Sequence, residues 1–408
     1  MKQMWWWVCV LVLAIGQGAA AQETAVSSHT VLPGDTWTAL AYRYQTDVQA
    51  LNPHMNRQRQ PTIGAEIAVP GEADAQMGAL LRTGDGGLLA TAVRQNTSPW
   101  TIALQNNLNY PYHPLFNQPL FLPGGDAPPR DLPAGFSSLE VSQLTAHPGQ
   151  ALGYRAEVGQ PIAVTAALAG LPFVVGENGR YQVGLVGTGA FFGSGEPELT
   201  IQPAGQPLWT QPWRFVDPNT WIYQEVNYTG AAAEIDQAAI DTERARLREI
   251  WGQVSPEPLW DAPFTEPITN YLEVTADYGA RRSTNGGPYN RYHEGVDFSA
   301  YGGTTVFAPA GGVVVLAEPL YVRGGAVIVD HGLGIYSGYY HLRDIFVEAG
   351  TAVFPGDPLG AVGTTGLSTG NHLHWDLLVG STWIDAAAWL EQDMGCWILT
   401  GLGQNCND

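Results

Sequence analysis

The sequence predicts a multidomain, mainly β protein with small α/β units at its start, a β-sandwich-like middle domain and a C-terminal antiparallel β-sheet. Three observations lead to this fold class. The 408 residues include 49 glycines and 29 prolines, and only 14% are charged, against about 25% in an average protein. Short apolar runs separated by glycine-containing turns fill the second half of the chain. Near the start, a pattern with a period of roughly fifty residues occurs twice.

The charge balance restricts the possible partners. The chain carries 18 basic and 38 acidic residues, which gives a net charge of −20. A surface of this sign repels phosphate backbones, so we expect no nucleic-acid partner.

The first residues indicate export. Lys2 precedes the apolar run Met4–Ile15, and the small residues Ala19–Ala21 follow, as in a cleaved signal peptide covering residues 1–21. A membrane anchor is the alternative, but about a dozen apolar residues are too few to cross a bilayer core of ~30 Å comfortably. We therefore expect a secreted, extracytoplasmic protein without a stable membrane span in its mature form.

Residues 29–70 form the first of the two small units. Asp35 is placed to cap the first helix, in which Trp37 and Leu40 share one face. The expected order is strand, helix, helix, strand: His29–Val31, Thr36–Tyr44, Asp47–Asn52 and Ile67–Pro70.

This unit resembles the LysM module, a domain that binds peptidoglycan and chitin. The resemblance implies a groove between two loops that binds glycan containing N-acetylglucosamine. The residues of that groove would be Gly34, Asp35, Thr36, Ile63 and Gly64. A looser copy, residues 80–123, has a Gly84–Gly86 turn but lacks the His-Thr-Val opening. It resembles a degenerate LysM module, and its sugar binding stays open.

The middle of the chain has no sequence pattern typical of a catalytic site. After a linker rich in proline and glycine (123–133), residues 134–228 alternate short apolar and polar runs, as expected for a β-sandwich-like domain. Its single histidine, His147, stands without a cluster of titratable residues. A structural or positioning role is the natural interpretation.

A helix over residues 231–251 is expected to connect this domain to the next, and binding of a partner is the alternative. Its inward positions would be Ile235, Ala239, Leu247 and Ile250. Its charged residues, Glu243, Arg244, Arg246, Arg248 and Glu249, would form a solvated face.

Residues 258–397 contain five of the nine histidines, on a background of short β-rich runs with glycine turns. His372 and His374 are two apart on one strand, so both imidazoles point to one face. His293 and Asp297 would be about 13 Å apart on a straight strand, but Gly295 permits a bend between them. Two imidazoles and a carboxylate match the ligand set of catalytic zinc sites.

Other interpretations of these pairs are weaker. His293 and Asp297 alone would suggest a surface ion pair. His372 and His374 alone would suggest a cupin-type metal enzyme, but the glutamate expected a few residues later is missing. We expect His331 to lie in a turn without a role in the site.

Several motifs carry a stronger resemblance. The segments Tyr289–Asp297, Tyr339–Leu342 and Gly370–His374, in this order, are similar to the lysostaphin-type zinc metallopeptidases of peptidoglycan. Further similar segments are Tyr278–Arg281, Val306–Gly312, Asp330–Gly332 and Val353–Gly366. The resemblance covers most of residues 258–397.

It implies one Zn²⁺ per catalytic domain, held by His293, Asp297 and His374, with His341 and His372 as catalytic residues. His372 would act as general base, while His341 and the ion would stabilise the oxyanion. The implied protein is a secreted, wall-associated endopeptidase. It cuts peptide stems or cross-bridges of peptidoglycan in its groove and is anchored to the glycan by LysM. A non-catalytic wall-binding protein, or an activator of another hydrolase, is the alternative.

The chain ends in an expected tail, residues 398–408. Cys396 and Cys406 are the two cysteines that follow the signal segment. In an oxidising compartment they form either a disulfide that closes this tail or two free thiols.

Overall fold

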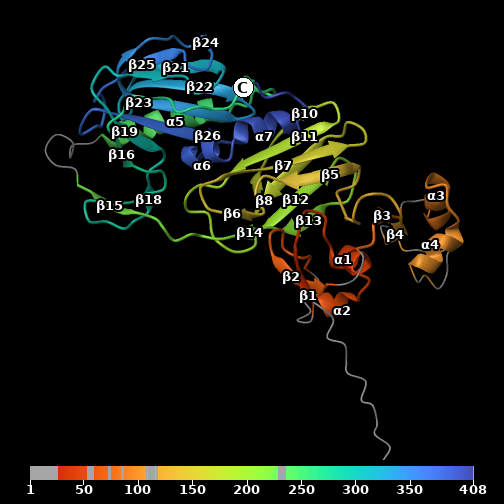
Figure 1. The fold of residues 1–408 in the computed structure, drawn as a ribbon. Helices are drawn as coiled ribbons and strands as arrows, with labels where there is room; N and C mark the ends of the chain where they lie inside the picture. The colour runs from red at the N-terminus through yellow and green to blue at the C-terminus, as the bar shows by residue number, and fades with distance from the viewer. Residues whose placement is uncertain are drawn as a thin grey trace, which may run out of the picture.

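The computed structural model describes residues 26–52, 59–71, 75–83, 87–106, 108, 115, 118–227 and 236–407. The expected signal segment, the Gly84–Gly86 turn and the start of the connector helix (231–235) lie outside these residues. Figure 1 shows several small sheets followed by one large C-terminal sheet, so the mainly β, multidomain fold class is confirmed. Among the described residues, no helix is both long and apolar enough to cross a bilayer.

The first unit has the expected order of elements: β1 (Val26–Thr30), α1 (Trp37–Arg43), α2 (Val48–Leu51) and β2 (Glu66–Pro70). The prediction that Asp35 caps α1 is wrong, because the Thr36 side chain accepts the N–H of Ala39. Asp35 is buried instead, and its Oδ2 lies 2.7 Å from Leu32 N and 2.9 Å from His29 Nε2. Its carboxylate fixes the loop before the helix.

The second unit repeats this plan with a core of its own. A small apolar cluster that includes Leu88, Ile102 and Leu120 holds it together. Its elements are β3 (Gly78–Arg82), α3 (Gly87–Arg94), α4 (Pro99–Gln105) and β4 (Pro119–Pro123).

Two four-stranded antiparallel sheets make up the middle of the molecule. One has the order β10-β11-β7-β5 and the other β13-β12-β8-β9. Alternate residues of β7 and β12, such as Leu152 and Ile201, fill the space between the sheets. A short parallel pair, β6 with β14, lies beside them. The strands are β5 (Phe136–Val141), β6 (Thr145–Ala146), β7 (Ala151–Val158), β8 (Val164–Leu168), β9 (Leu171–Pro172), β10 (Val174–Asn178), β11 (Tyr181–Gly187), β12 (Glu198–Pro203), β13 (Trp209–Pro212) and β14 (Arg214–Phe215).

The large sheet has ten strands, with the main order β16-β19-β26-β23-β22-β21-β24. Its strands are β16 (Glu273–Ala276), β19 (Val296–Ser299), β20 (Thr305–Phe307), β21 (Gly312–Leu320), β22 (Gly324–Gly332), β23 (Ile335–Ile345), β24 (Ala352–Val353), β25 (Pro358–Val362), β26 (His372–Val379) and β27 (Thr382–Ile384). A small sheet joins β15 (Tyr223–Val226), β17 (Arg281–Thr284) and β18 (Arg291–Tyr292).

The sandwich and the large sheet share one hydrophobic core. Val183 and Leu185 of β11 belong to the same buried cluster as Leu377 and Val379 of β26. Two C-terminal helices, α6 (Ala386–Glu391) and α7 (Met394–Gly401), join this cluster, and α7 packs against β7 and β11. The expected tail 398–408 therefore begins inside a helix that is part of the core. A disulfide joins Cys396 to Cys406.

Helix α5 (Gln237–Trp251) covers the large sheet through Leu247 and Trp251, which share a cluster with Tyr340 of β23 and Leu378 of β26. The prediction that Glu243 belongs to a solvated face is wrong. Its side chain is 4% exposed and pairs with Arg323. The helix is thus fixed to the sheet by buried charge as well as by apolar contacts.

Candidate metal and catalytic site

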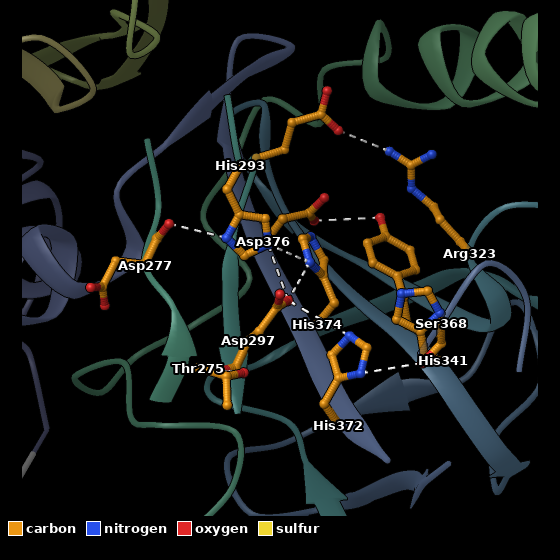
Figure 2. Close-up of polar contacts among 12 residues, drawn as sticks. Thr275, Asp277, His293, Asp297, Arg323, His341, Ser368, His372, His374 and Asp376 are labelled. Atoms are coloured by element: carbon orange, nitrogen blue, oxygen red, sulfur yellow. Dashed lines mark hydrogen bonds and ion pairs between the residues drawn. The ribbon is translucent and has the colours of Figure 1, made fainter. Parts of the chain in front are cut away.

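Three potential metal ligands converge on one point of the large sheet (Figure 2). His293 Nε2 lies 3.0 Å from His374 Nδ1 and 3.1 Å from Asp297 Oδ1, and His374 Nδ1 lies 2.8 Å from the same oxygen. Ligand atoms at about 2.0–2.2 Å from a tetrahedral zinc ion are themselves about 3.3 Å apart. The observed spacing is close to the one that a single ion requires.

The backbone explains why these residues meet. Asp297 on β19 stands directly opposite His374 on β26 in an antiparallel pair, so the two side chains are neighbours on one face. His293 returns to them through a bend at Gly295. A Cβ at Gly295 would lie 2.2 Å from the backbone oxygen of Trp375, so only glycine fits this close approach. The sequence suggested glycine here because of a bend, and the close approach to Trp375 is a second reason for it.

The protons in this cluster support a cation site. His293 Nδ1 lies 3.0 Å from the backbone oxygen of Asp277, which can only accept, so Nδ1 carries the proton. Nε2 of the neutral ring then presents a lone pair to the cluster. With Asp297 ionised and both rings neutral, as they must be to bind a metal ion, the three converging atoms share at most one proton, on His374 Nδ1. The lone pairs of these atoms then repel one another, and a cation bound between them would remove this repulsion. These residues therefore fit a zinc ion.

The charge states are those that metal binding needs. Burial raises the pKa of Asp297, but the rings of His293 and His374 outweigh this effect and hold the pKa well below its usual range. Burial also lowers the pKa of His374 to about 3. At neutral pH the carboxylate is therefore charged and the His374 imidazole neutral, as metal ligands must be.

The two histidines predicted to be catalytic lie beside this cluster. His372 Nε2 is 3.9 Å from Asp297 Oδ1, and the ring centroids of His341 and His372 are 4.7 Å apart. Each ring has Nδ1 next to a backbone oxygen, Thr365 O at 2.8 Å for His341 and Gly370 O at 2.9 Å for His372. In the neutral form, both residues therefore offer Nε2 as a base.

His341 is held in an unusual backbone conformation. Its φ is +63°, in the left-handed region that residues other than glycine seldom adopt. Burial lowers the pKa of its imidazole to about 4. A strained and desolvated histidine beside a metal-ligand cluster is typical of functional sites.

His331 does not belong to this site. The prediction of a turn histidine is wrong, because His331 is fully buried on strand β22. The remaining histidines of residues 258–397 are those of the cluster, so the structure brings together His293, Asp297, His341, His372 and His374.

Sequence reasoning missed the charged residues that support the site. Arg282 Nη2 lies 3.7 Å from Asp297 Oδ2, and Arg323 lies between Glu243 and Glu294. Arg323 and Glu243 are 80 residues apart, so no local pattern could pair them. The position of Glu294 directly after His293 was the one available signal.

The five residues of the predicted glycan groove are also together, but they pack against the sandwich. Gln211 of β13 accepts the N–H of Gly34 at 2.8 Å, and Ile63 is fully buried in the sandwich core. A Cβ at Gly64 would lie 1.9 Å from Leu144 O. Asp35 is buried, and Thr36 is 8% exposed. Glycan binding by these loops stays a prediction, and in this arrangement the sandwich occupies their surface.

Two family models match the chain. Residues 291–386 match peptidase family M23, and residues 29–70 match the LysM domain. The second match has the boundaries expected from the sequence. The first contains all five residues of the candidate site.

Similar proteins match the same C-terminal region. An uncharacterised metalloprotease of Haemophilus influenzae is 37% identical over 113 residues, 27% of this chain and 23% of the relative. Peptidoglycan DD-endopeptidase ShyA of Vibrio cholerae is 33% identical over 113 residues, 28% of this chain and 26% of the relative. The match thus spans about a quarter of each relative's length. A crystal structure of a candidate M23 peptidase from Pseudomonas aeruginosa is 25% identical, with a TM-score of 0.46 over 60% of this chain and 93% of that chain.

Proposed function

We propose, from the premise that residues 291–386 form a peptidase family M23 domain, that the protein is a secreted zinc-dependent endopeptidase of bacterial peptidoglycan. The observation that carries the proposal is the convergence of His293 Nε2, Asp297 Oδ1 and His374 Nδ1 next to two more imidazoles. The name of the Vibrio relative, a DD-endopeptidase, favours D,D-peptide bonds of stems and cross-links over glycine bridges.

His293, Asp297 and His374 would hold one Zn²⁺. When bound, the ion supplies a Lewis acid that activates water and polarises the scissile carbonyl. His372 lies next to these three ligands, with its Nε2 3.9 Å from Asp297 Oδ1. Its lone pair accepts the proton of the attacking water and later returns it to the leaving amine. The bond from Nδ1 to Gly370 O keeps the required tautomer.

We assign oxyanion stabilisation to His341. Because its Nδ1 is committed to Thr365 O, only Nε2 faces the reacting groups. Nε2 can donate a hydrogen bond to the oxyanion only when the ring carries a second proton. His341 would therefore contribute as the imidazolium, whose second proton comes from bulk solvent, while the proton of the attacking water stays with His372 for the leaving amine. The neutral ring is its resting form.

We assign wall attachment to the N-terminal LysM domain, whose family match supports a partner containing N-acetylglucosamine. Substrate peptide would bind beside His341 and His372. An extracytoplasmic, wall-associated location follows from such a substrate, and the disulfide between Cys396 and Cys406 is consistent with an oxidising compartment.

The test compares alanine variants at the five positions. His293→Ala, Asp297→Ala and His374→Ala each remove one ligand, so both bound zinc and endopeptidase activity should be lost. His341→Ala and His372→Ala should keep near-stoichiometric zinc and lose about 10²–10⁴ in rate. Metal content is measured by atomic emission, and the rate by mass spectrometry of fragments from cross-linked peptidoglycan.

The matched control is His147→Ala, in the sandwich, which should retain both zinc and rate. If His372→Ala lost its zinc while His374→Ala kept it, the two roles on β26 would be exchanged. If wild type bound zinc and cut no peptidoglycan, the non-catalytic alternative would replace the peptidase.

A further inference from the structure

We propose that Arg323 is a positioning residue of this active site and that Glu243 of helix α5 holds it in place. The inference rests on the proposed function. Arg323 lies in the turn between β21 and β22, and its guanidinium reaches two carboxylates. Nη1 is 3.1 Å from Glu243 Oε1 and Nη2 is 3.3 Å from Glu294 Oε2. In Figure 2, Arg323 is drawn on the same side of the metal cluster as His341.

Arg323 acts on His341 through the backbone. The N–H of His341 donates to Arg323 O at 2.8 Å. A non-glycine residue in the left-handed region must be stabilised by contacts with its surroundings. This hydrogen bond stabilises the backbone of His341. The hydrogen bond from the ring to Thr365 O fixes the side chain of His341. A shift of Arg323 would therefore move the imidazole.

Arg323 acts on the metal side through Glu294. This residue directly follows the ligand His293, and its carboxylate is anchored to the second arm of the guanidinium. The guanidinium of Arg323 thus connects the segment that carries the ligand His293 to the turn whose backbone holds His341. An arginine can make both contacts at once because its nitrogen atoms point in fixed, different directions.

Glu243 fixes the guanidinium of Arg323 from helix α5. Its side chain is 4% exposed, and a buried carboxylate is tolerated only when its charge is compensated. Arg323 compensates Oε1, and the N–H of Val322 donates to Oε2 at 2.7 Å. The Arg323 side chain also lies over the rings of Tyr340 and Trp251, at 5.1 and 5.7 Å from their centroids. Helix α5, outside the M23 match, therefore belongs to the catalytic unit.

A second ion pair on the same helix separates positioning from simple attachment. Arg246 of α5 forms a salt bridge with Glu318 of β21, and both side chains are largely exposed. This pair also attaches the helix to the sheet, but it contacts none of the five site residues. Arg246→Met is therefore the matched control for Arg323→Met.

The experiment uses the full, zinc-loaded chain and measures kcat and KM on a soluble cross-linked muropeptide dimer. Arg323→Met should lower kcat by about 10- to 100-fold, the cost of a small misplacement of catalytic groups, with unchanged KM and zinc content. Arg323→Lys should recover only part of the rate, since one ammonium cannot span both carboxylates. Arg246→Met should stay within about twofold of wild type, because exposed pairs contribute little.

A second readout is independent of turnover. Labelling of His341 by diethyl pyrocarbonate, followed by mass spectrometry, should be several-fold faster in Arg323→Met than in wild type or Arg246→Met. If wild type shows no turnover, the proposed function fails, and the labelling rates still test the positioning.

The inference is overturned if Arg323→Met matches wild type in kcat and labelling, or if Arg246→Met loses as much as Arg323→Met. If Arg323→Met fails to fold, Glu294→Gln tests the positioning role instead. Glu294 is 34% exposed, so its replacement does not disturb the core. It should lower kcat several-fold with an unchanged melting temperature, and an unchanged kcat would refute the role.

Discussion

His331 is a histidine that the fold keeps neutral. Its Nδ1 donates to Gly311 O at 2.7 Å, and its Nε2 accepts from the Ser337 hydroxyl at 2.7 Å. Burial lowers the pKa of the ring from 6.5 to about 4. Protonation would reverse the hydrogen bond with Ser337 and place a charge in the core, so this residue links folding to pH.

We predict that His331 makes the protein less stable in acid. The unfolded chain binds more protons between pH 6.5 and about 4, so the stabilisation is complete above pH 6.5 and is lost as the pH falls. The loss is on the order of 3 kcal/mol. Urea unfolding with a chelator present should show a difference between wild type and His331→Asn that shrinks over this range. A difference independent of pH would contradict the prediction.

The residues of the candidate site were predicted mainly from the resemblance of three segments to a known family, and the local spacing of the residues agreed with it. His372 and His374 alternate on one strand, and Gly295 marks the bend between His293 and Asp297. The burial of Glu243 was not predictable, because an acidic residue among arginines on a helix looks solvated until the sheet supplies Arg323. Asp35 was mistaken for a cap for a different reason, because Thr36 is an equally suitable capping residue next to it. The carboxylate of Asp35 instead contacts His29 and Leu32, six and three residues before it.

At the scale of elements, α7 shows how the C-terminus is stabilised. Ile398, Leu399 and Leu402 are buried in the core shared by the sandwich and the large sheet. The disulfide between Cys396 and Cys406 closes the chain that follows. The sequence indicated the possible bridge, but the helix spanning the expected boundary at residue 397 depends on contacts with β7 and β11.

We predict that this disulfide stabilises the docked helix. By limiting the freedom of the unfolded chain, a loop of this length contributes about 3 kcal/mol. A reductant should lower the thermal unfolding midpoint of wild type. The double variant Cys396→Ser, Cys406→Ser should start from the lower midpoint and show no response to reductant, which makes it the control. Equal midpoints for reduced and oxidised wild type would count against this role.

At the scale of the whole molecule, the LysM domain is joined to the sandwich by polar contacts. Gln211 accepts from Gly34 N and donates to Asp35 O at 3.0 Å and Pro61 O at 3.1 Å. The N–H of Ile63 donates to Pro212 O at 2.8 Å. A module's own sequence cannot reveal which of its faces a neighbour covers, so the burial of these loops was not predictable.

We predict that loosening this contact increases attachment to the wall. Gln211→Ala removes three buried hydrogen bonds between β13 and the loops of the first unit. The docked state then becomes less favourable relative to the undocked state. A shift of about 1.4 kcal/mol would expose the loops tenfold more often. Co-sedimentation with purified sacculi should rise several-fold.

Thr210→Ala serves as the control, since its side chain points to the other face of β13 and should leave sedimentation unchanged. Reduced or unchanged sedimentation of Gln211→Ala would mean that these loops are not the glycan-binding surface.

The packed segment between the two small units and the sandwich has a mechanical consequence. Trp209 Nε1 donates to Asp131 O, and Asp131 N donates to Gly34 O, both at 2.7 Å, so the proline- and glycine-rich stretch is clamped at its end. Because the sandwich and the large sheet share one core, the clamped state holds the first small unit and the candidate site in one fixed arrangement, with the glycan loops covered. Release of the Gln211 contacts would uncover these loops and turn the stretch into a tether. The length of that tether would then set how far from its attachment point the candidate site can reach.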